Sequence, residues 1–145
     1  MKKILLYSNA MLLLTSLHHI YGAVIYQTPE RYHILFLSIP VLAFNSYIRL
    51  KGNSIPKTLR LIHAGVTFLV PITLIGLFEG LYNHGLKNAL YFLGTPTRTM
   101  LRMFPPPVYV MPNDFIFEFT GVLQAILALP LLYTFVRFFT PRKTL

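Results

Sequence analysis

The chain alternates long apolar stretches with short polar breaks, a pattern that predicts helices crossing a membrane. The apolar stretches cover residues 4–26, 30–50, 58–83 and 115–139. Each is close to or above the ~20 residues that an α-helix needs to cross a bilayer. Polar turn residues at 27–29 and 51–57 separate the first three stretches. We therefore expect an all-α fold, a four-helix transmembrane bundle that forms one integral membrane domain over residues 1–145.

One long connection, residues 84–113, joins the third and fourth predicted helices as a loop on the outer side of the membrane. It contains an apolar run at 86–93, a candidate interfacial helix, and the rigid sequence Pro105-Pro106-Pro107. Loops of this length in small proteins are often lids or binding loops. The alternative is a cap that only covers the helix ends, and the sequence leaves both open.

Composition supports a membrane location. Hydrophobic residues make up 54% of the chain and charged residues 12%, whereas soluble domains are about 25% charged. The chain has no cysteine, which excludes disulfides, thiolate metal sites and iron–sulfur clusters. Met-Lys-Lys before an apolar run could begin a signal peptide. However, the run reaches Tyr26 without a clear cleavage site, so we expect a retained helix.

The cations predict the orientation in the membrane. They lie beside the apolar stretches, which indicates topology and contact with anionic lipid, and no nucleic acid partner is expected. With both termini in the cytoplasm, nine cations lie inside: Lys2, Lys3, Arg49, Lys51, Lys57, Arg60, Arg137, Arg142 and Lys143. Four lie outside: Arg31, Lys87, Arg98 and Arg102. The sequence thus predicts a multi-pass protein of the cell inner membrane, or of another energy-coupled membrane.

Ionisable side chains gather in the outer half of this arrangement. They comprise all four acids and four of the five histidines: Glu30, Glu79, Asp114, Glu118, His18, His19, His33 and His84. Only His63 lies near the inner surface, where we expect a structural role. A charge facing lipid at the membrane centre costs at least ~2.5 kcal/mol. The outer groups are therefore expected to face the bundle interior and to find partners there.

Helical spacing also directs these groups inward. Small residues share faces with them: Ser8 and Thr15 with His19, Gly76 and Gly80 with Glu79, and Gly121, Ala125 and Ala128 with Glu118. Small residues let membrane helices approach each other closely. The same Gly76–Gly80 pair also suggests homo-oligomerisation, or membership of a larger membrane complex, as a further hypothesis.

This pattern predicts a metal site on the outer side of the bundle. Histidine nitrogen together with carboxylate oxygen suits iron, zinc or manganese. The candidate ligands are His18, His19, His33, Glu79, His84, Asp114 and Glu118. We expect His19, Glu79 and Glu118 to be the inward ligands and Glu30 to be the least secure candidate. If the protein is an enzyme, its apolar surroundings favour a lipid-like or otherwise hydrophobic substrate.

The spacing only partly matches a known metal pattern. Glu30 and His33 have the Glu-x-x-His spacing of carboxylate-bridged dimetal bundles. Glu79 and His84, however, are five residues apart and would point roughly 140° apart in a regular helix. The first predicted helix also supplies no acid. A site is therefore expected, but not the standard dimetal one.

Other interpretations remain open at this point. Asp114 could cap a helix, and Glu30 could interact with a helix dipole. The polar groups could form a structural network in a non-catalytic subunit, or a proton or ion pathway. A further alternative is a haem, with His18 or His19 opposite His84 and with Arg98 or Arg102 near the propionates.

Overall fold

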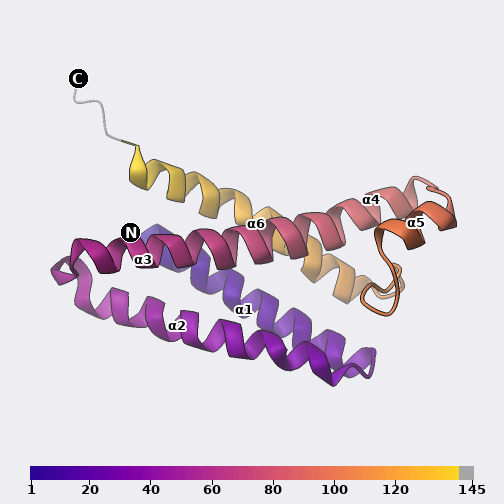
Figure 1. Cartoon of the computed structure of the whole chain (residues 1–145), viewed down its shortest axis with the longest axis horizontal. Helices are drawn as coiled ribbons and strands as arrows, with labels where there is room; N and C mark the ends of the chain where they lie inside the picture. The colour runs from indigo at the N-terminus through magenta and orange to yellow at the C-terminus, as the bar shows by residue number, and fades with distance from the viewer. Residues whose placement is uncertain (141–145) are drawn as a thin grey trace.

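The computed structural model describes residues 1–140 and is helical, with no strand in that range (Figure 1). The elements are α1 (Lys2–Ile25), η1 (Pro29–Tyr32), α2 (His33–Lys51), η2 (Gly52–Ser54), α3 (Lys57–Thr67), η3 (Phe68–Leu86), α4 (Lys87–Phe92), α5 (Thr97–Met103) and α6 (Phe115–Phe139). η1 and η2 are short 3-10 turns, whereas η3 is a π-helix. The all-α expectation is confirmed.

Four helical rods lie side by side, because α3, η3 and α4 follow one another without a break (Figure 1). α6 packs against η3 and α1, and α1 also packs against α2. The N-terminus, the α2–α3 turn and the end of α6 lie at one end of the molecule, here the inner end. The α1–α2 turn, α4 and α5 lie at the other, here the outer end.

Three helices are long and apolar enough to cross a membrane: Pro29–Lys51, Lys57–Phe92 and Phe115–Phe139. α1 does not reach that degree of apolarity, so the prediction of four spans is supported for three. The reason lies in the polar residues of α1, which include Thr15, His18 and His19. All three are buried against the other helices, so they lower the hydropathy of α1 without being placed on its outer surface.

The third helix extends beyond the expected end at residue 83. It continues to Phe92, so the apolar run at 86–93 is its last part and not a separate interfacial helix. It ends where Gly94 adopts a φ of +78°, a left-handed conformation that favours glycine. The connection to α6 is correspondingly shorter than predicted, and it contains α5.

Small residues bring η3 and α6 close together. A Cβ atom on Gly76 would lie 2.5 Å from the Cβ of Ala128, and one on Gly80 would lie 2.5 Å from the backbone nitrogen of Ala125. The predicted close helix approach is confirmed. These glycines are covered by α6 of the same chain, so the close approach that they allow is made within the chain, and homo-oligomerisation stays a prediction.

An apolar layer crosses the middle of the bundle. It consists of Met11, Leu12, Val41, Ile75 and Ala128, all at most 8% exposed. On its inner side, His63 Nε2 lies 3.0 Å from Asn45 Oδ1, and Asn45 Nδ2 donates to Ser8 Oγ at 3.0 Å. This layer separates the inner polar cluster from the ionisable groups of the outer half.

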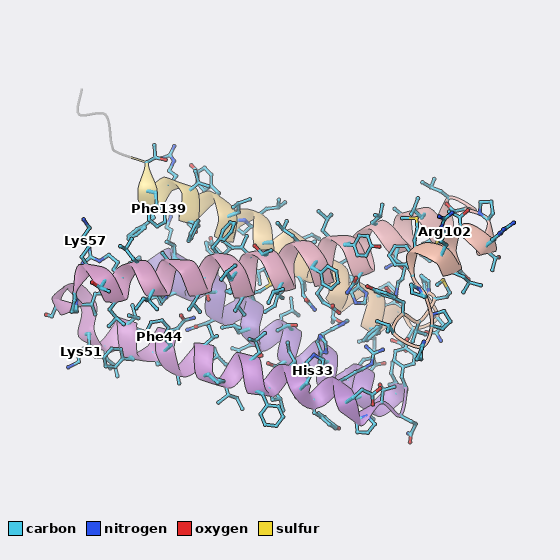
Figure 2. All side chains as sticks on the ribbon, in the orientation of Figure 1. His33, Phe44, Lys51, Lys57, Arg102 and Phe139 are labelled. Atoms are coloured by element: carbon cyan, nitrogen blue, oxygen red, sulfur yellow. The ribbon has the colours of Figure 1, made fainter. Side chains whose placement is uncertain are left out.

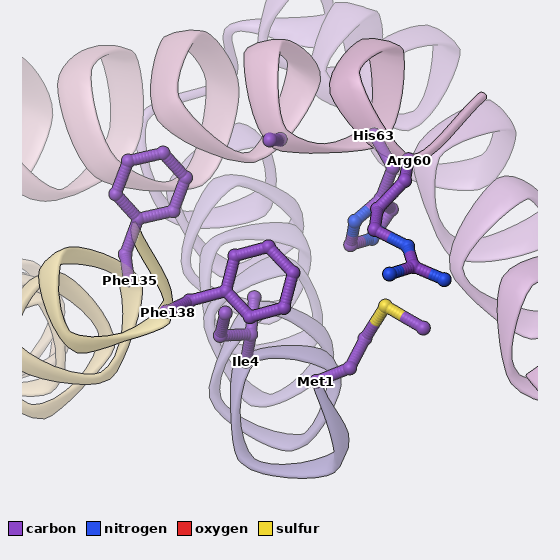
Figure 3. A pocket seen from close by; sticks show the side chains of 7 residues that line it. Met1, Ile4, Arg60, His63, Phe135 and Phe138 are labelled. Atoms are coloured by element: carbon purple, nitrogen blue, oxygen red, sulfur yellow. The ribbon is translucent and has the colours of Figure 1, made fainter. Parts of the chain in front are cut away.

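The structural role expected for His63 fits its surroundings. Beside it lies a cavity of about 10 Å³ that is also lined by Met1, Ile4 and Arg60 (Figure 3). A cavity needs at least ~10 Å³ to hold a single water molecule. This cavity beside His63 is therefore too small for a ligand larger than water.

Candidate metal centre

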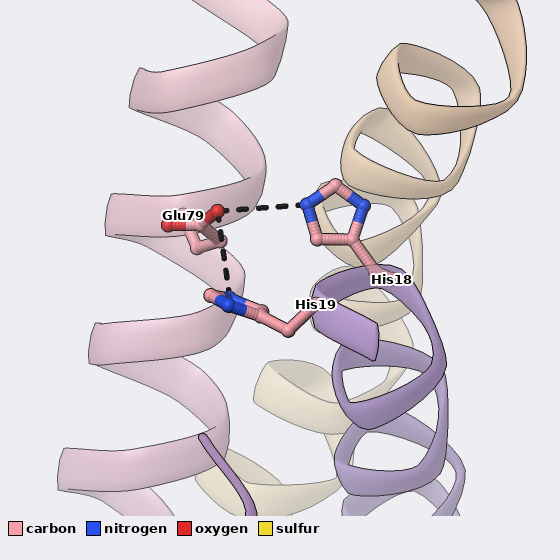
Figure 4. Close-up of side chains that lie close together, drawn as sticks. All are labelled: His18, His19 and Glu79. Atoms are coloured by element: carbon pink, nitrogen blue, oxygen red, sulfur yellow. Dashed lines mark ion pairs between the residues drawn. The ribbon is translucent and has the colours of Figure 1, made fainter. Parts of the chain in front are cut away.

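His18, His19 and Glu79 form a group that could hold a metal ion. One ligand atom from each lies within 4.8 Å of the others. His18 and His19 come from α1, and Glu79 comes from η3 (Figure 4). The Nε2 atoms of His18 and His19 lie 3.6 and 3.7 Å from the same carboxylate atom, Glu79 Oε1. Both histidines are buried. Two adjacent residues of α1 therefore lie close to a single carboxylate of η3.

His84 approaches the same oxygen atom. Its Nε2 lies 3.4 Å from Glu79 Oε1, although it is not part of the group that His18, His19 and Glu79 form. The expectation that Glu79 and His84 diverge by 140° is wrong, because they lie in a π-helix. Hydrogen bonds from residue i to i+5 place residues five apart nearly above one another. The π-helix therefore turns both side chains toward α1.

Thr120 fixes the ring of His18. Its hydroxyl oxygen lies 2.9 Å from His18 Nδ1, and its single hydrogen is donated to the carbonyl of Ile116 at 2.7 Å. When that hydrogen lies on the carbonyl of Ile116 or Phe117, Thr120 accepts from His18, and a neutral His18 then carries its proton on Nδ1. A neutral His18 then has a free electron pair on Nε2, the atom that faces Glu79. This is the tautomer that a metal ligand requires.

Glu118 contacts the Nδ1 side of the His84 ring, the side away from Glu79. Its Oε2 atom accepts from His84 Nδ1 at 2.8 Å and from Asn88 Nδ2 at 2.6 Å. Its Oε1 atom accepts from Lys87 Nζ at 2.9 Å. Both oxygens thus have partners, and Glu118 lies outside the group that His18, His19 and Glu79 form, although it was expected as a direct ligand. A carboxylate behind a histidine is a common arrangement around metal-ligating imidazoles.

Glu79 is oriented in a similar way. Its second oxygen, Oε2, accepts from Asn83 Nδ2 at 2.7 Å. This bond directs Oε1 toward the three histidines. Asn83, Lys87, Asn88 and Thr120 were not among the sequence candidates. Three of them follow Glu79 and His84 at helical spacing, a signal that was available in the sequence.

Other predicted residues lie away from the group. Asp114 caps α6 by accepting from the backbone nitrogen of Phe117 at 2.8 Å, which matches its capping interpretation. Glu30 is exposed, and His33 Nδ1 lies 2.7 Å from the carbonyl oxygen of Glu30. The rings of His33 and His19 are 5.6 Å apart. Neither member of the Glu-x-x-His pair therefore joins the three residues.

The haem arrangement with His18 opposite His84 does not fit. The centroids of the two rings are 4.7 Å apart, which leaves no space for a macrocycle between them. Arg98 and Arg102, the expected propionate partners, are exposed residues of α5. Arg102 lies at the tip of the molecule (Figure 2). Neither lines the cavity beside the site.

That cavity has a volume of about 500 Å³. His19, Glu79 and His84 line one part of it, and residues of η1, η3, α6 and the segment 107–110 are among those that line the rest. Small-molecule sites typically have volumes of about 300–1,000 Å³. The group thus borders a space that is large enough for a ligand.

Comparisons with protein-family models, curated proteins and solved structures found no match to this chain.

Proposed function

We propose that this protein is a membrane-embedded metalloprotein that binds a divalent transition metal through His18, His19 and Glu79. The observation that carries the proposal is the spacing around Glu79 Oε1. Three Nε2 atoms surround it at 3.4–3.7 Å, beyond the ~3.2 Å limit of ordinary hydrogen bonds. Two ligands of one tetrahedral zinc ion lie ~3.3 Å apart. The spacing therefore fits ligands around a cation better than directly paired groups.

The donor set narrows the metal. Two histidines and one carboxylate bind zinc in several hydrolases and non-haem iron in oxygenases. We place iron and zinc first, with manganese as the next candidate. Three protein ligands leave a coordination position open, which is typical of catalytic rather than structural sites. The open coordination position therefore favours an enzyme. His84 is available as a fourth ligand or as a proton carrier.

The outer surface of the bundle supports a membrane location. Leu6, Leu13 and Leu17 of α1 are each more than half exposed. The polar residues of the same helix, including Thr15 and His18, are buried. This pattern is the inverse of a water-soluble helix, and it supports a membrane crossing by α1 as a fourth span.

Charge supports the proposed orientation. Seven of the nine cations expected inside lie near the inner ends of α1, α2, α3 and α6. The other two, Arg142 and Lys143, lie outside the described residues. By the positive-inside rule, this end faces the cytoplasm. The metal site then faces the periplasm or the corresponding outer side. Because the chain has no cysteine, Val108→Cys and Lys57→Cys can each be labelled with an impermeant maleimide. Only Val108→Cys should react from outside.

A proton pathway is less well supported. The apolar layer around Met11 and Leu12 lies between the outer site and the polar cluster at Asn45. Continuous proton transfer across the membrane needs a polar chain, and this layer interrupts it. The polar groups of the outer half therefore support a local site better than a transmembrane route.

Elemental analysis tests the proposal directly. Protein purified in mild detergent without chelator should contain close to one iron, zinc or manganese per chain. His19→Ala and Glu79→Ala should each abolish this metal. His63→Ala removes a buried histidine from the opposite end and should retain it. The proposal is contradicted if the metal persists in both site variants. It is also contradicted if folded protein that never met a chelator contains no metal. A Soret band would indicate haem instead.

A further inference from the structure

The open side of the candidate centre faces the cavity. Of the three proposed ligands, His19 and Glu79 line the cavity, whereas His18 lies behind them, stacked on Phe117 with ring centroids 4.2 Å apart. An ion held by these ligands is therefore covered on the side of α6 and accessible from the cavity. A ligand that completes its coordination must come from that space.

The charge around the centre favours an anion. The donor set supplies one carboxylate against a divalent cation. The second nearby carboxylate, Glu118, is matched by Lys87 at 2.9 Å. The centre with its metal therefore keeps a net positive charge, which a bound anion would neutralise. Water could supply this anion as hydroxide, but the cavity is far larger than one water requires.

Arg31 adds a second positive group at the cavity wall. Its guanidinium lies 5.1 Å from the centroid of the Phe117 ring, the same ring that stacks on His18. Its Nε donates to Thr28 Oγ1 at 2.8 Å, which holds the guanidinium in place. The two terminal nitrogens make no hydrogen bond to any residue that the structure describes. Arg31 is thus fixed in position, with N–H donors available for an oxyanion. Glu30 beside it is the one exposed acid among the residues that line the cavity.

Tyr109 supplies a neutral polar group to the same lining. Burial, together with Tyr82 and the Glu79 carboxylate, raises the pKa of Tyr109. The hydroxyl therefore keeps its proton at neutral pH and can donate a hydrogen bond.

Part of the lining is apolar. Phe78 from η3 and Pro107, Val108 and Val110 from the connection before α6 form this part of the wall. Val108 is 70% exposed and Phe78 is 50% exposed, so both leave apolar surface uncovered. A hydrocarbon chain would cover this surface, and an amphiphile matches a cavity that is cationic at one end and apolar at the other.

We propose that the cavity binds an amphiphile with an anionic oxygen head group, which contacts the metal and Arg31, while its hydrocarbon chain lies against Phe78, Val108 and Val110. This inference rests on the proposed metal site and adds the class of ligand. A free long-chain carboxylate and an acidic phospholipid share this chemistry.

Cobalt substitution tests the inference, because the visible spectrum of Co²⁺ reports its coordination. The protein is loaded with Co²⁺ in nanodiscs of zwitterionic lipid and titrated with dodecanoate. Dodecanoate should change the spectrum at least tenfold more potently than acetate, which lacks the chain, and dodecanol, which lacks the charge, should leave it unchanged. Nanodiscs that contain phosphatidylglycerol distinguish the two sources. A change without added dodecanoate identifies the phospholipid, and a change only after its addition identifies the free carboxylate.

Two variants separate the head group from the chain. Arg31→Gln should weaken dodecanoate binding about tenfold without changing the amount of bound Co²⁺, whereas Arg98→Gln, outside the cavity, should change neither. Val108→Asn, which adds a polar group without a charge, should weaken dodecanoate binding and leave acetate binding unchanged. Failure to bind Co²⁺ overturns the metal site and this inference with it. Bound Co²⁺ with equal responses to dodecanoate and acetate, or with no response to either, overturns the inference alone.

Discussion

Thr120→Val isolates the contribution of one hydroxyl to metal binding. Valine keeps the shape of threonine but cannot accept the Nδ1 proton of His18, which is now held at 2.9 Å. The buried N–H then has no partner at that position. His18 can escape this cost by moving its proton to Nε2, where it faces Glu79. That tautomer has no free electron pair on the atom that must bind the metal.

The size of the effect follows from these two outcomes. A buried donor without a partner costs about 1–3 kcal/mol, and loss of an outer hydrogen bond to a ligating histidine costs about 10–100-fold in metal affinity. The two ranges agree, because a tenfold change corresponds to about 1.4 kcal/mol. We therefore expect Thr120→Val to weaken metal binding by about 10–100-fold. The change should be smaller than that of His19→Ala, which removes a ligand.

Competition with a chromophoric chelator measures this affinity in detergent. Thr134→Val is the matched control, since Thr134 lies on the same helix and makes the same kind of bond. Its hydroxyl donates to the carbonyl of Pro130 at 2.9 Å, as that of Thr120 does to Ile116. Unchanged affinity in Thr120→Val, or an equal loss in Thr134→Val, would refute the assignment of the His18 tautomer and its role.

Three further predictions concern packing, charge and pH. Gly121→Ala places a Cβ atom against the ring of His84, so we expect about 1–3 kcal/mol of destabilisation from overpacking, measured by thermal unfolding, together with weaker metal binding. Lys87→Met leaves Glu118 without its cation in a buried site. It should cost about 3–5 kcal/mol, whereas Lys57→Met, at an exposed position, should leave the melting temperature unchanged. Protons compete with the metal for imidazole nitrogen and carboxylate oxygen, so bound metal should decrease as the pH is lowered and should rebind at neutral pH. Bound metal that does not change down to about pH 3 would contradict ligation by His18, His19 and Glu79.

Much of the fold could be predicted from hydropathy and turn residues. The apolar stretches locate three long helices, although the third continues nine residues beyond its predicted end at 83. Small residues such as Gly80 locate the contact between η3 and α6. Whether α1 crosses the membrane is harder to predict, because its polar residues interrupt the apolar stretch and their partners are not visible in the sequence. Thr15 and His18 are buried by other helices. Only the assembled bundle therefore reveals that the outer surface of α1 is apolar.

The site was only partly predictable, and the main reason is the π-helix. Regular helical spacing separates Glu79 from His84 and favours Glu118 as a ligand. In a π-helix, Glu79 and His84 share a face, and Glu118 then meets the Nδ1 side of His84 instead of the centre. Sequence patterns based on 3.6 residues per turn cannot detect this change. Ionisable residues at one depth remain informative, because burial requires partners whatever the helix geometry.

The π-helix also accounts for the arrangement of carboxylates in the site. A π-helix is rare, and short π segments often lie at functional sites. Here its effect is that one helix supplies both the carboxylate at the centre, Glu79, and the histidine beside it, His84. Each then needs only one partner to be oriented, Asn83 for Glu79 and Glu118 for His84. A regular helix would point His84 away from α1 and leave Glu118 without its imidazole partner. The local winding of η3 therefore determines which carboxylate can contact a metal and which one can only support a ligand.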